Sequence, residues 1–293
     1  MGQLKSVSLI EFVRFCRDNE VKQIATPLNT DLQDNVGALP LQKIDIPPMD
    51  EHAQRILAMR NNQELIEADL TKIIHQDPTL STKIIVAANS PIYQLAQPCE
   101  TLKRAIITIG AQKTLNIAIA CALLKPFEGA MTKKYIDVYF NRSLTLAAIM
   151  QLVTRELQKH HRQLSHEKAY FIGLISEFGE CIAAHCYSDD YQAIKTLAAM
   201  NPHCQQQHIE RTVSSFTFSL LNQWVLKRWG LTTDILHALQ HSSKSEYTLI
   251  LDLTRSIYQY IQTSEYTDQA IYIAGQHHID YFKLCEQIRE RVA

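Results

Sequence analysis

The sequence predicts an all-α protein. Only 8 of its 293 residues are glycine, and long runs are rich in Leu, Ile, Ala, Gln and Lys, which favours helices over turn-dense sheets. Apolar residues recur at helical spacing, whereas no segment alternates convincingly between apolar and polar residues, as a half-buried strand would. Because 46% of the residues are hydrophobic, the chain can bury a sizeable core without disulfides or metals.

The first forty residues are expected to stand apart from the rest. Residues 8–20 are predicted to form a short amphipathic helix, with Leu9, Phe12 and Val13 at helical spacing. From residue 21 to residue 48 the periodicity fades, and several prolines indicate a connector. We therefore assign residues 1–40 to an N-terminal helix and connector.

Helix signals then follow one another closely. After helices predicted over 49–59 and 65–75, Asp77 and Pro78 mark a helix start, because Asp accepts from the free amides of the first turn and Pro is tolerated there. Pro91 ends that helix, since it disfavours helical geometry in the residue before it. Thr101 is expected to cap the next helix, which closes at Gly110, and an apolar helix follows over 111–124.

The second half continues the helical pattern. A long helix is expected over 133–160, and another begins at Glu167, breaks at Gly179 and resumes to His185. Asn201 and Pro202 repeat the start signal seen at Asp77 and Pro78. The remaining helices are predicted over 216–229, 233–242, 246–262, 268–275 and 279–292.

The composition excludes several classes of protein. The net charge is −1, and the small Lys/Arg clusters are separated by acids, so nucleic-acid binding is not predicted. The seven cysteines form no CxxC pair, which argues against a disulfide framework and a zinc ribbon. No stretch reaches 18 apolar residues, and residues 8–16 are too short and charged for a signal peptide. We expect a cytoplasmic protein that does not bind membranes.

Three short motifs lie in a fixed order in the first half. They are Asp77-Pro78, then Ala88-Asn89-Ser90-Pro91-Ile92-Tyr93, then the segment from Ala105 to Gly110. Together they resemble the HDOD family, a group related to HD-type phosphohydrolases. The resemblance implies two packed helical lobes: an HDOD bundle over 41–128 and an HD-like lobe over 129–293. It also implies structural roles for Asp77, Pro78, Asn89, Ser90, Gly110, Gly173 and Gly179.

The segment from Phe171 to Gly179 resembles the central helix of an HD domain whose metal ligands are missing. HD enzymes have a His-Asp pair where this chain has Ser176 and Glu177, and an earlier His where it has Ser143. A Ser hydroxyl is a poor substitute for imidazole as a metal ligand. Many HDOD proteins also carry His at the position of Phe218. The resemblance thus implies a cleft without metal, cofactor or catalytic residues, lined by Ser143, Ser176, Glu177, Phe218 and His241.

Glu177 provides an internal test of this interpretation. An unpaired buried carboxylate is costly, so Glu177 should be hydrogen-bonded if it packs the former metal site. Arg142 and Lys168 are the nearest candidate partners in sequence.

Three functions remain open. The first is a non-catalytic bacterial signalling or regulatory module that binds protein partners, with input arriving in trans or through residues 1–40. The second is a sensor that holds a nucleotide or metabolite in the vestigial cleft. The third is a divergent metal-dependent phosphohydrolase that acts on a nucleotide or phosphoester. Its candidate ligands are Glu177, Asp252 and the helical i,i+4 pair His237 and His241.

Overall fold

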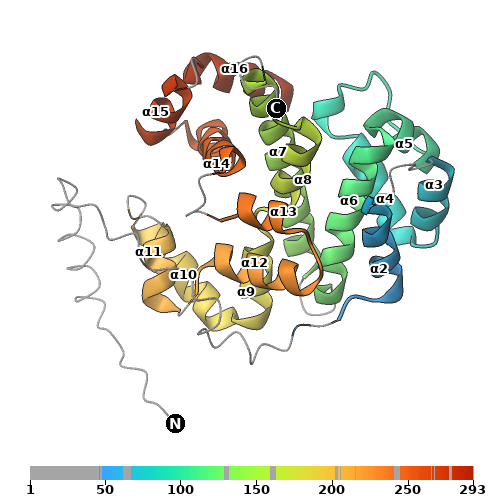
Figure 1. The fold of residues 1–293 in the computed structure, drawn as a ribbon, viewed down its shortest axis with the longest axis horizontal. Coiled ribbons are helices and arrows are strands. Elements are labelled where there is room, and N and C mark those ends of the chain that lie inside the picture. The colour runs from blue at the N-terminus through green and yellow to red at the C-terminus, as the bar shows by residue number, and fades with distance from the viewer. Residues whose placement is uncertain are drawn as a thin grey trace, which may run out of the picture.

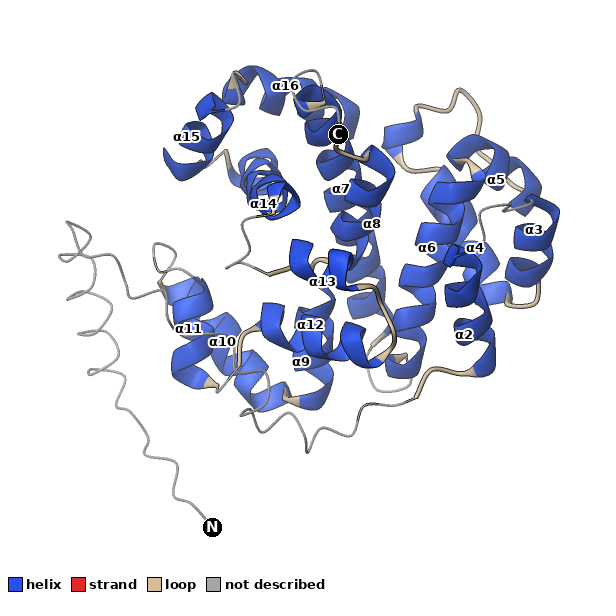
Figure 2. Cartoon of the chain, in the orientation of Figure 1, coloured by secondary structure: helices blue, strands red, loops and turns tan. Residues whose placement is uncertain are grey.

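The computed structural model describes residues 46, 48–61, 67–128, 132–158, 163–201, 204, 206–214, 216–240, 245–264, 266, 268–276 and 279–292. Every regular element within these residues is a helix, so the all-α prediction is confirmed (Figure 2). The predicted helix over 8–20 and most of the following connector lie outside the described residues.

Helices follow one another along both halves of the chain, and the longest is α7 at the start of the second half (Figure 1). The first half contains α2 (Glu51–Ala58), η2 (Met59–Asn61), α3 (Glu67–His75), α4 (Pro78–Ala88), η3 (Pro91–Tyr93), α5 (Leu102–Ile109), α6 (Ala111–Leu124) and η4 (Lys125–Phe127). The second contains α7 (Lys133–Leu157), α8 (His166–Ile175), α9 (Phe178–Cys186), α10 (Ser188–Met200), α11 (Gln206–Val213), α12 (Phe218–Arg228), α13 (Thr233–Ala238), α14 (Glu246–Thr263), α15 (Asp268–Gln276) and α16 (Tyr281–Val292).

Side-chain caps set the helix boundaries in the first half, as the sequence indicates. The Asp77 carboxylate accepts from the Leu80 amide at 3.1 Å, and the Thr101 hydroxyl accepts from the Arg104 amide at 3.3 Å. At Gly110 the chain has a φ of 88°, which favours glycine. This residue separates α5 from α6, and the two helices meet at an angle of 112°.

The turn after α4 is fixed by the amide of Asn89. Its Oδ1 accepts from the Cys99 amide at 2.6 Å, while its Nδ2 donates to the carbonyls of Cys99 at 2.8 Å and Ile85 at 3.1 Å. Ser90 begins η3 without a side-chain cap bond of its own. Asn89 therefore ties the end of α4 to the segment that leads into α5.

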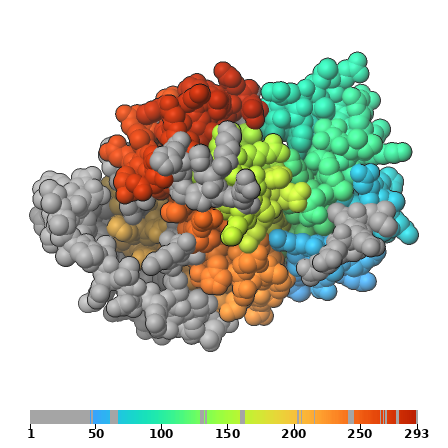
Figure 3. All heavy atoms as spheres, turned by 45° about the horizontal axis from the view of Figure 1, so that its top comes forward, coloured from blue at the N-terminus to red at the C-terminus, as the bar shows by residue number. Residues whose placement is uncertain are grey.

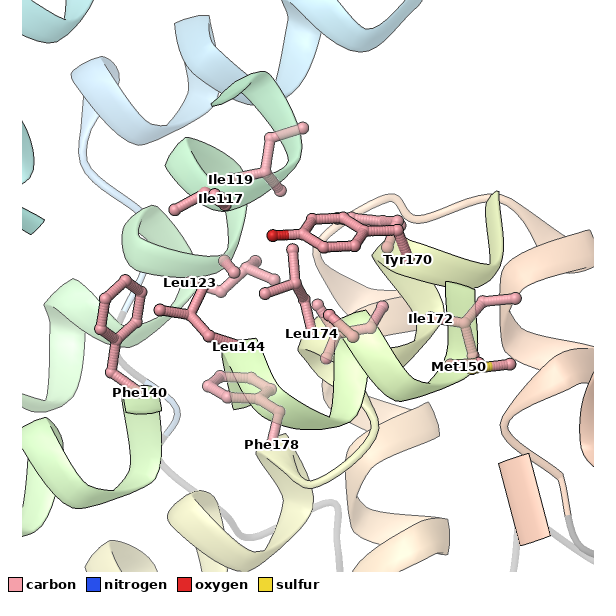
Figure 4. Close-up of a cluster of buried hydrophobic side chains, with 14 of the residues drawn as sticks. Ile117, Ile119, Leu123, Phe140, Leu144, Met150, Tyr170, Ile172, Leu174 and Phe178 are labelled. Carbon is pink, nitrogen blue, oxygen red and sulfur yellow. The ribbon is translucent and has the colours of Figure 1, made fainter. Parts of the chain in front are cut away.

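The core of the fold is centred on α6, α7 and α8. Every residue of α6 from Thr114 to Leu124 is buried. Figure 4 shows side chains of α6, such as Leu123, meeting Leu144 of α7 and Leu174 of α8 in one apolar cluster. The backbones of α7 and α8 approach closely, because a Cβ on Gly173 would lie only 2.6 Å from the Ala147 Cα.

The C-terminal helices cover the outer side of α7. Helix α14 packs along α7, and α16 contacts α7, α14 and the short η3 of the first half. Figure 3 shows these helices, in red, lying against the yellow-green surface of α7 and α8. Buried apolar side chains from both halves form one continuous cluster. The division into two lobes between residues 128 and 129 stays a prediction.

Three features of the second half differ from the sequence prediction. The break within the helix predicted from Glu167 lies at Ser176 and Glu177, not at Gly179, which is buried within α9. The sequence signals also missed α10 altogether. The helix predicted over 233–242 is shorter than expected, since α13 ends at Ala238 and residues 241–244 lie outside the described part.

In the described part of the chain, no single helix is long and apolar enough to cross a membrane. Only α5 taken together with the segment Ala111–Phe127 meets that requirement, across its sharp bend.

Candidate functional site

The junction between α8 and α9 carries Ser176 and Glu177. The Ser176 hydroxyl donates to the Gly173 carbonyl at 2.9 Å, within its own helix. From α12, Asn222 Nδ2 donates to the carbonyls of Ile175 at 2.9 Å and Ser176 at 3.1 Å. These bonds satisfy carbonyls that the end of α8 leaves without helical partners. Glu177 then adopts φ −99° and ψ 7°, which opens the new helix α9.

The carboxylate of Glu177 lies between two arginines from different helices. Its Oε2 accepts from Nη2 of Arg142 on α7 at 2.7 Å, and its Oε1 accepts from Nε of Arg255 on α14 at 3.0 Å. Its side chain is only 12% exposed. The expectation that Glu177 is hydrogen-bonded is therefore confirmed, and Arg142 is one partner. Lys168 is not, since its ammonium pairs with Asp234 at 2.7 Å.

Glu180, one turn further along α9, extends this ion-pair network. Its Oε2 accepts from Arg142 Nη1 at 3.1 Å, and its Oε1 accepts from Lys195 Nζ at 2.9 Å. The same Oε1 accepts from the Tyr191 hydroxyl at 3.2 Å, which in turn accepts from the Tyr135 hydroxyl at 3.3 Å. The network thus joins α7, α9, α10 and α14.

The charges of this network reinforce each other. Burial by itself would lower the pKa of Arg142, but the adjacent carboxylates of Glu177 and Glu180 outweigh burial and raise it. Asp252 lies 3.5 Å from Nη1 of Arg255, and burial raises its pKa although Arg255 opposes the shift. Arg255 therefore stands beside both carboxylates that the hydrolase hypothesis uses, Glu177 and Asp252.

Ser143 and Phe218 are both buried near this network. Ser143 is 2% exposed, and its hydroxyl makes no hydrogen bond to the described residues. Phe218 is 7% exposed, and its ring centroid lies 6.0 Å from that of Tyr191. Its carbonyl approaches the α9 backbone so closely that a Cβ on Gly179 would lie 1.9 Å from it. Gly179 thus allows α9 and α12 to pack together.

A second buried carboxylate, that of Glu210, lies at the start of α12. It accepts from the Phe218 amide at 2.9 Å and from Gln206 Nε2 at 2.8 Å, and it is 3% exposed. Burial raises its pKa, and the charges of Glu180 and Glu177 add to that shift.

Apart from Arg142, the residues that surround Glu177 were not identified from the sequence. Glu180 could have been found from its i,i+3 spacing, which places it one turn after Glu177. Arg255, Lys195 and Asn222 had no local signal, because they are brought in by helices 15 to 78 residues away along the chain from the groups they contact.

Of the two candidate His ligands, the structure describes only His237, which does not contact Glu177. His237 is exposed on α13, and its Nδ1 lies 3.2 Å from Oε1 of Gln240. His241 lies outside the described residues, as do the His pairs at 160–161 and 277–278. Among the described residues, no three His, Cys, Asp or Glu side chains are grouped closely enough to hold a metal ion.

This arrangement does not fit the metal centre of an HD enzyme. Both oxygens of Glu177 are engaged by guanidinium groups, and the neighbouring position is a Ser whose hydroxyl bonds to its own helix. What these residues can do is hold four helices together by charge.

Comparisons with known proteins agree with this fold. Three solved structures resemble it: a protein from Marinobacter aquaeolei VT8 described as a signal transduction protein (TM-score 0.68, 20% identity), a protein from Shewanella amazonensis SB2B described as a phosphohydrolase (0.65, 20%), and an HDOD domain protein from Geobacter sulfurreducens (0.64, 16%). The similarities cover 95%, 85% and 86% of this chain and 62%, 92% and 94% of those chains.

This chain therefore spans less than two thirds of the Marinobacter protein. No curated protein matches the sequence. The HDOD domain family matches residues 46–245, which include the α8–α9 junction and all of the network except Arg255 and Asp252. Because this match covers more than half of the chain, the protein belongs to the HDOD family.

Proposed function

We propose that this protein is a non-catalytic regulatory module of a bacterial signalling pathway, which acts by binding other molecules and not by metal-dependent hydrolysis. The observation that carries the proposal is the carboxylate of Glu177, which stands at the HD position and is held by Arg142 and Arg255. The name of the Marinobacter relative is consistent with a signalling role.

The electrostatics of the Glu177 site disfavour a divalent ion. At about 4 Å, a dication and a guanidinium repel each other by about 8 kcal/mol at an effective dielectric constant of about 20. Two such groups contact Glu177, and Ser143 and Ser176 supply no strong ligand to compensate. In place of a metal, the ion-pair network links α7, α9, α10 and α14.

Metal content tests the proposal. Tag-free protein would be incubated with Mn, Fe and Zn, desalted, and analysed by elemental mass spectrometry. We expect less than about a tenth of an equivalent of each metal, because a working centre needs about three protein ligands. About one equivalent that is lost in Glu177→Gln and kept in the exposed control Glu286→Gln would overturn the proposal and revive the hydrolase.

A small-molecule sensor is the second candidate, and one observation favours it. Arg142 Nε and Ser143 Oγ, which are adjacent on α7, are buried and make no hydrogen bond of good geometry with the part of the chain that the structure describes. Buried polar atoms are usually satisfied, so a small polar ligand could supply the missing bonds. The test is a thermal-shift screen with nucleotides. A rise in melting temperature that disappears in Ser143→Ala would support the sensor, and no rise with any nucleotide would count against it.

A further inference from the structure

Helices α3 and α5 border an open groove of about 670 Å³. Side chains from successive turns of each helix line it, including Thr71 and Lys72 of α3 and Leu102, Ile106 and Ile107 of α5. The two helices are in contact, and Figure 1 shows them at the edge of the molecule, away from the α8–α9 junction.

The floor of the groove is apolar. Leu102 and Ile106 are 8% and 2% exposed and belong to the core, whereas the neighbouring Ile107 is 63% exposed. Helix α5 therefore presents an isoleucine to solvent beside the side that it buries. An exposed apolar contact set in a concave surface is typical of a binding site, whereas one isoleucine on a convex surface is not.

The rim of the groove is basic. Lys72 on α3 and Lys103 on α5 are both exposed and line opposite sides, and the imidazole of His75 lies beside them. Within the described residues, neither lysine makes an ion pair. Among the described residues that line the groove, Glu67, the first residue of α3, is the one acid.

We propose that this groove binds an acidic amphipathic helix of a protein partner. This inference deepens the proposed function, because it gives the binding module a surface and its partner a chemistry. The lysines on both sides complement acidic residues flanking an apolar stripe, and the floor accepts that stripe. A helix as long as α3 or α5 spans about 12–14 Å, so the groove matches anchors one or two turns apart on the partner.

Other occupants fit less well. A single exposed isoleucine gives too little apolar surface for a lipid bilayer, and the groove has no aromatic side chain on which a nucleic-acid base could stack.

A peptide display library tests the proposal. It would hold 16-residue peptides in which leucines are fixed at helical spacing and the other positions vary among Glu, Lys, Gln and Ser. Selection on the full-length chain should enrich Glu over Lys. The affinity of the best peptide, measured by fluorescence anisotropy, should fall about tenfold or more in Ile107→Glu and in the pair Lys72→Glu with Lys103→Glu.

The control variant is Val138→Glu on α7. Val138 is 60% exposed, much like Ile107, but lies outside the groove, so the substitution should leave the affinity unchanged. Circular dichroism would check that each variant is folded. If Ile107→Glu does not fold, the pair Lys72→Glu with Lys103→Glu gives the same test. A folded protein tolerates charge changes at exposed residues better than it tolerates the loss of an apolar contact.

Three results would overturn the inference. They are a failure to enrich any peptide, enrichment of basic or uncharged peptides, and binding that Ile107→Glu and the lysine pair leave intact. The groove would instead be assigned to lipid if the protein binds no peptide but sediments with phosphatidylserine vesicles, and if the pair Lys72→Glu with Lys103→Glu abolishes that sedimentation. None of these results affects the metal content at Glu177, so the groove can fail while the proposed function stands.

Discussion

The carboxylate of Glu177 shows how a single residue decides the character of this site. It is 12% exposed, and it accepts from Arg142 and Arg255, whose side chains are 34% and 29% exposed. Removing one partner of a buried ion pair costs more than the pair contributes, because the remaining charge is left without compensation. Here two cations would lose a shared anion, and each would keep one other carboxylate, Glu180 for Arg142 and Asp252 for Arg255.

Glu177→Gln should therefore destabilise the fold. The shape of the side chain is kept but its charge is lost, and we expect a loss of about 2 kcal/mol, below the range for fully buried pairs because the arginines are partly solvated. Urea denaturation measures this change. The matched control is Glu286→Gln, at a 53% exposed side chain paired with Arg289, which should change stability by less than about 0.5 kcal/mol. Equal effects of the two substitutions would contradict the structural role of the network.

The buried carboxyl of Glu210 should make the stability of the fold depend on pH. Burial raises its pKa above the ordinary 4.5, so above that pH the folded protein binds more protons at this group than the unfolded chain does. The contribution of Glu210 to stability therefore declines as the pH rises through the window above 4.5. Relative to wild type, Glu210→Gln should gain stability between pH 4 and pH 7, as urea denaturation at the two pH values would show. No relative change over that interval would show that the folded carboxyl ionises as readily as the unfolded one, and a relative loss would show that it ionises more readily.

Two glycines decide how closely two pairs of helices pack. Gly173 lets α8 approach α7, and Gly179 lets α9 approach the start of α12. The sequence suggested a helix break at Gly179, but this glycine is needed for close approach, and the break occurs where Asn222 binds the carbonyls at the end of α8.

Substitutions of glycine by alanine separate close approach from helix propensity. Gly173→Ala would put a Cβ 2.6 Å from backbone atoms of α7, so α7 and α8 must shift apart, at a cost of about 2–3 kcal/mol. Gly275→Ala on α15 is the matched control, since a Cβ there meets nothing within 4 Å, and it should stabilise by up to about 1 kcal/mol. Thermal unfolding followed by circular dichroism measures both. A neutral Gly173→Ala would show that α7 and α8 do not pack as closely as described.

At the scale of the whole molecule, the C-terminal helices complete a fold that the family match leaves unfinished. The match ends at residue 245, yet α14 packs along α7 and supplies Arg255 to Glu177. Buried side chains of α14, such as Ile250, Leu253 and Ile257, belong to the common core.

A chain that ends at residue 245 should not fold cooperatively. Its loss of α14 would expose the apolar side of α7 and leave Glu177 with Arg142 alone. We expect aggregation in size-exclusion chromatography and a broad unfolding transition. Arg255→Ala in the full chain is the control, because it removes the ion pair and keeps the packing, and it should unfold cooperatively at reduced stability. A truncated chain with a sharp transition would instead make residues 46–245 an independent domain.

Much of the fold follows from local residue chemistry. Asp77, Pro78, Thr101 and Gly110 each act within one or two helical turns, so the boundaries of α4, α5 and α6 were predicted closely. The sequence also places Ser143, Ser176 and Glu177 where the family resemblance implies HD ligands, and that assignment stays a prediction. By contrast, the position of the break before α9 was not predicted, since Asn222 on the distant helix α12 holds the carbonyls there. Helix α10 was also missed, although Asp189 and Asp190 in its first turn are a local signal.

The sequence by itself determined the helical class and the caps that begin and end many helices. Only the tertiary structure decided which side chains surround Glu177. The charged residues around it, which lie on four helices, stabilise the fold only when the helices bring them together. They are Arg142, Glu180, Lys195 and Arg255. Caps act over three or four residues, whereas a salt bridge across 78 residues depends on how the whole core packs.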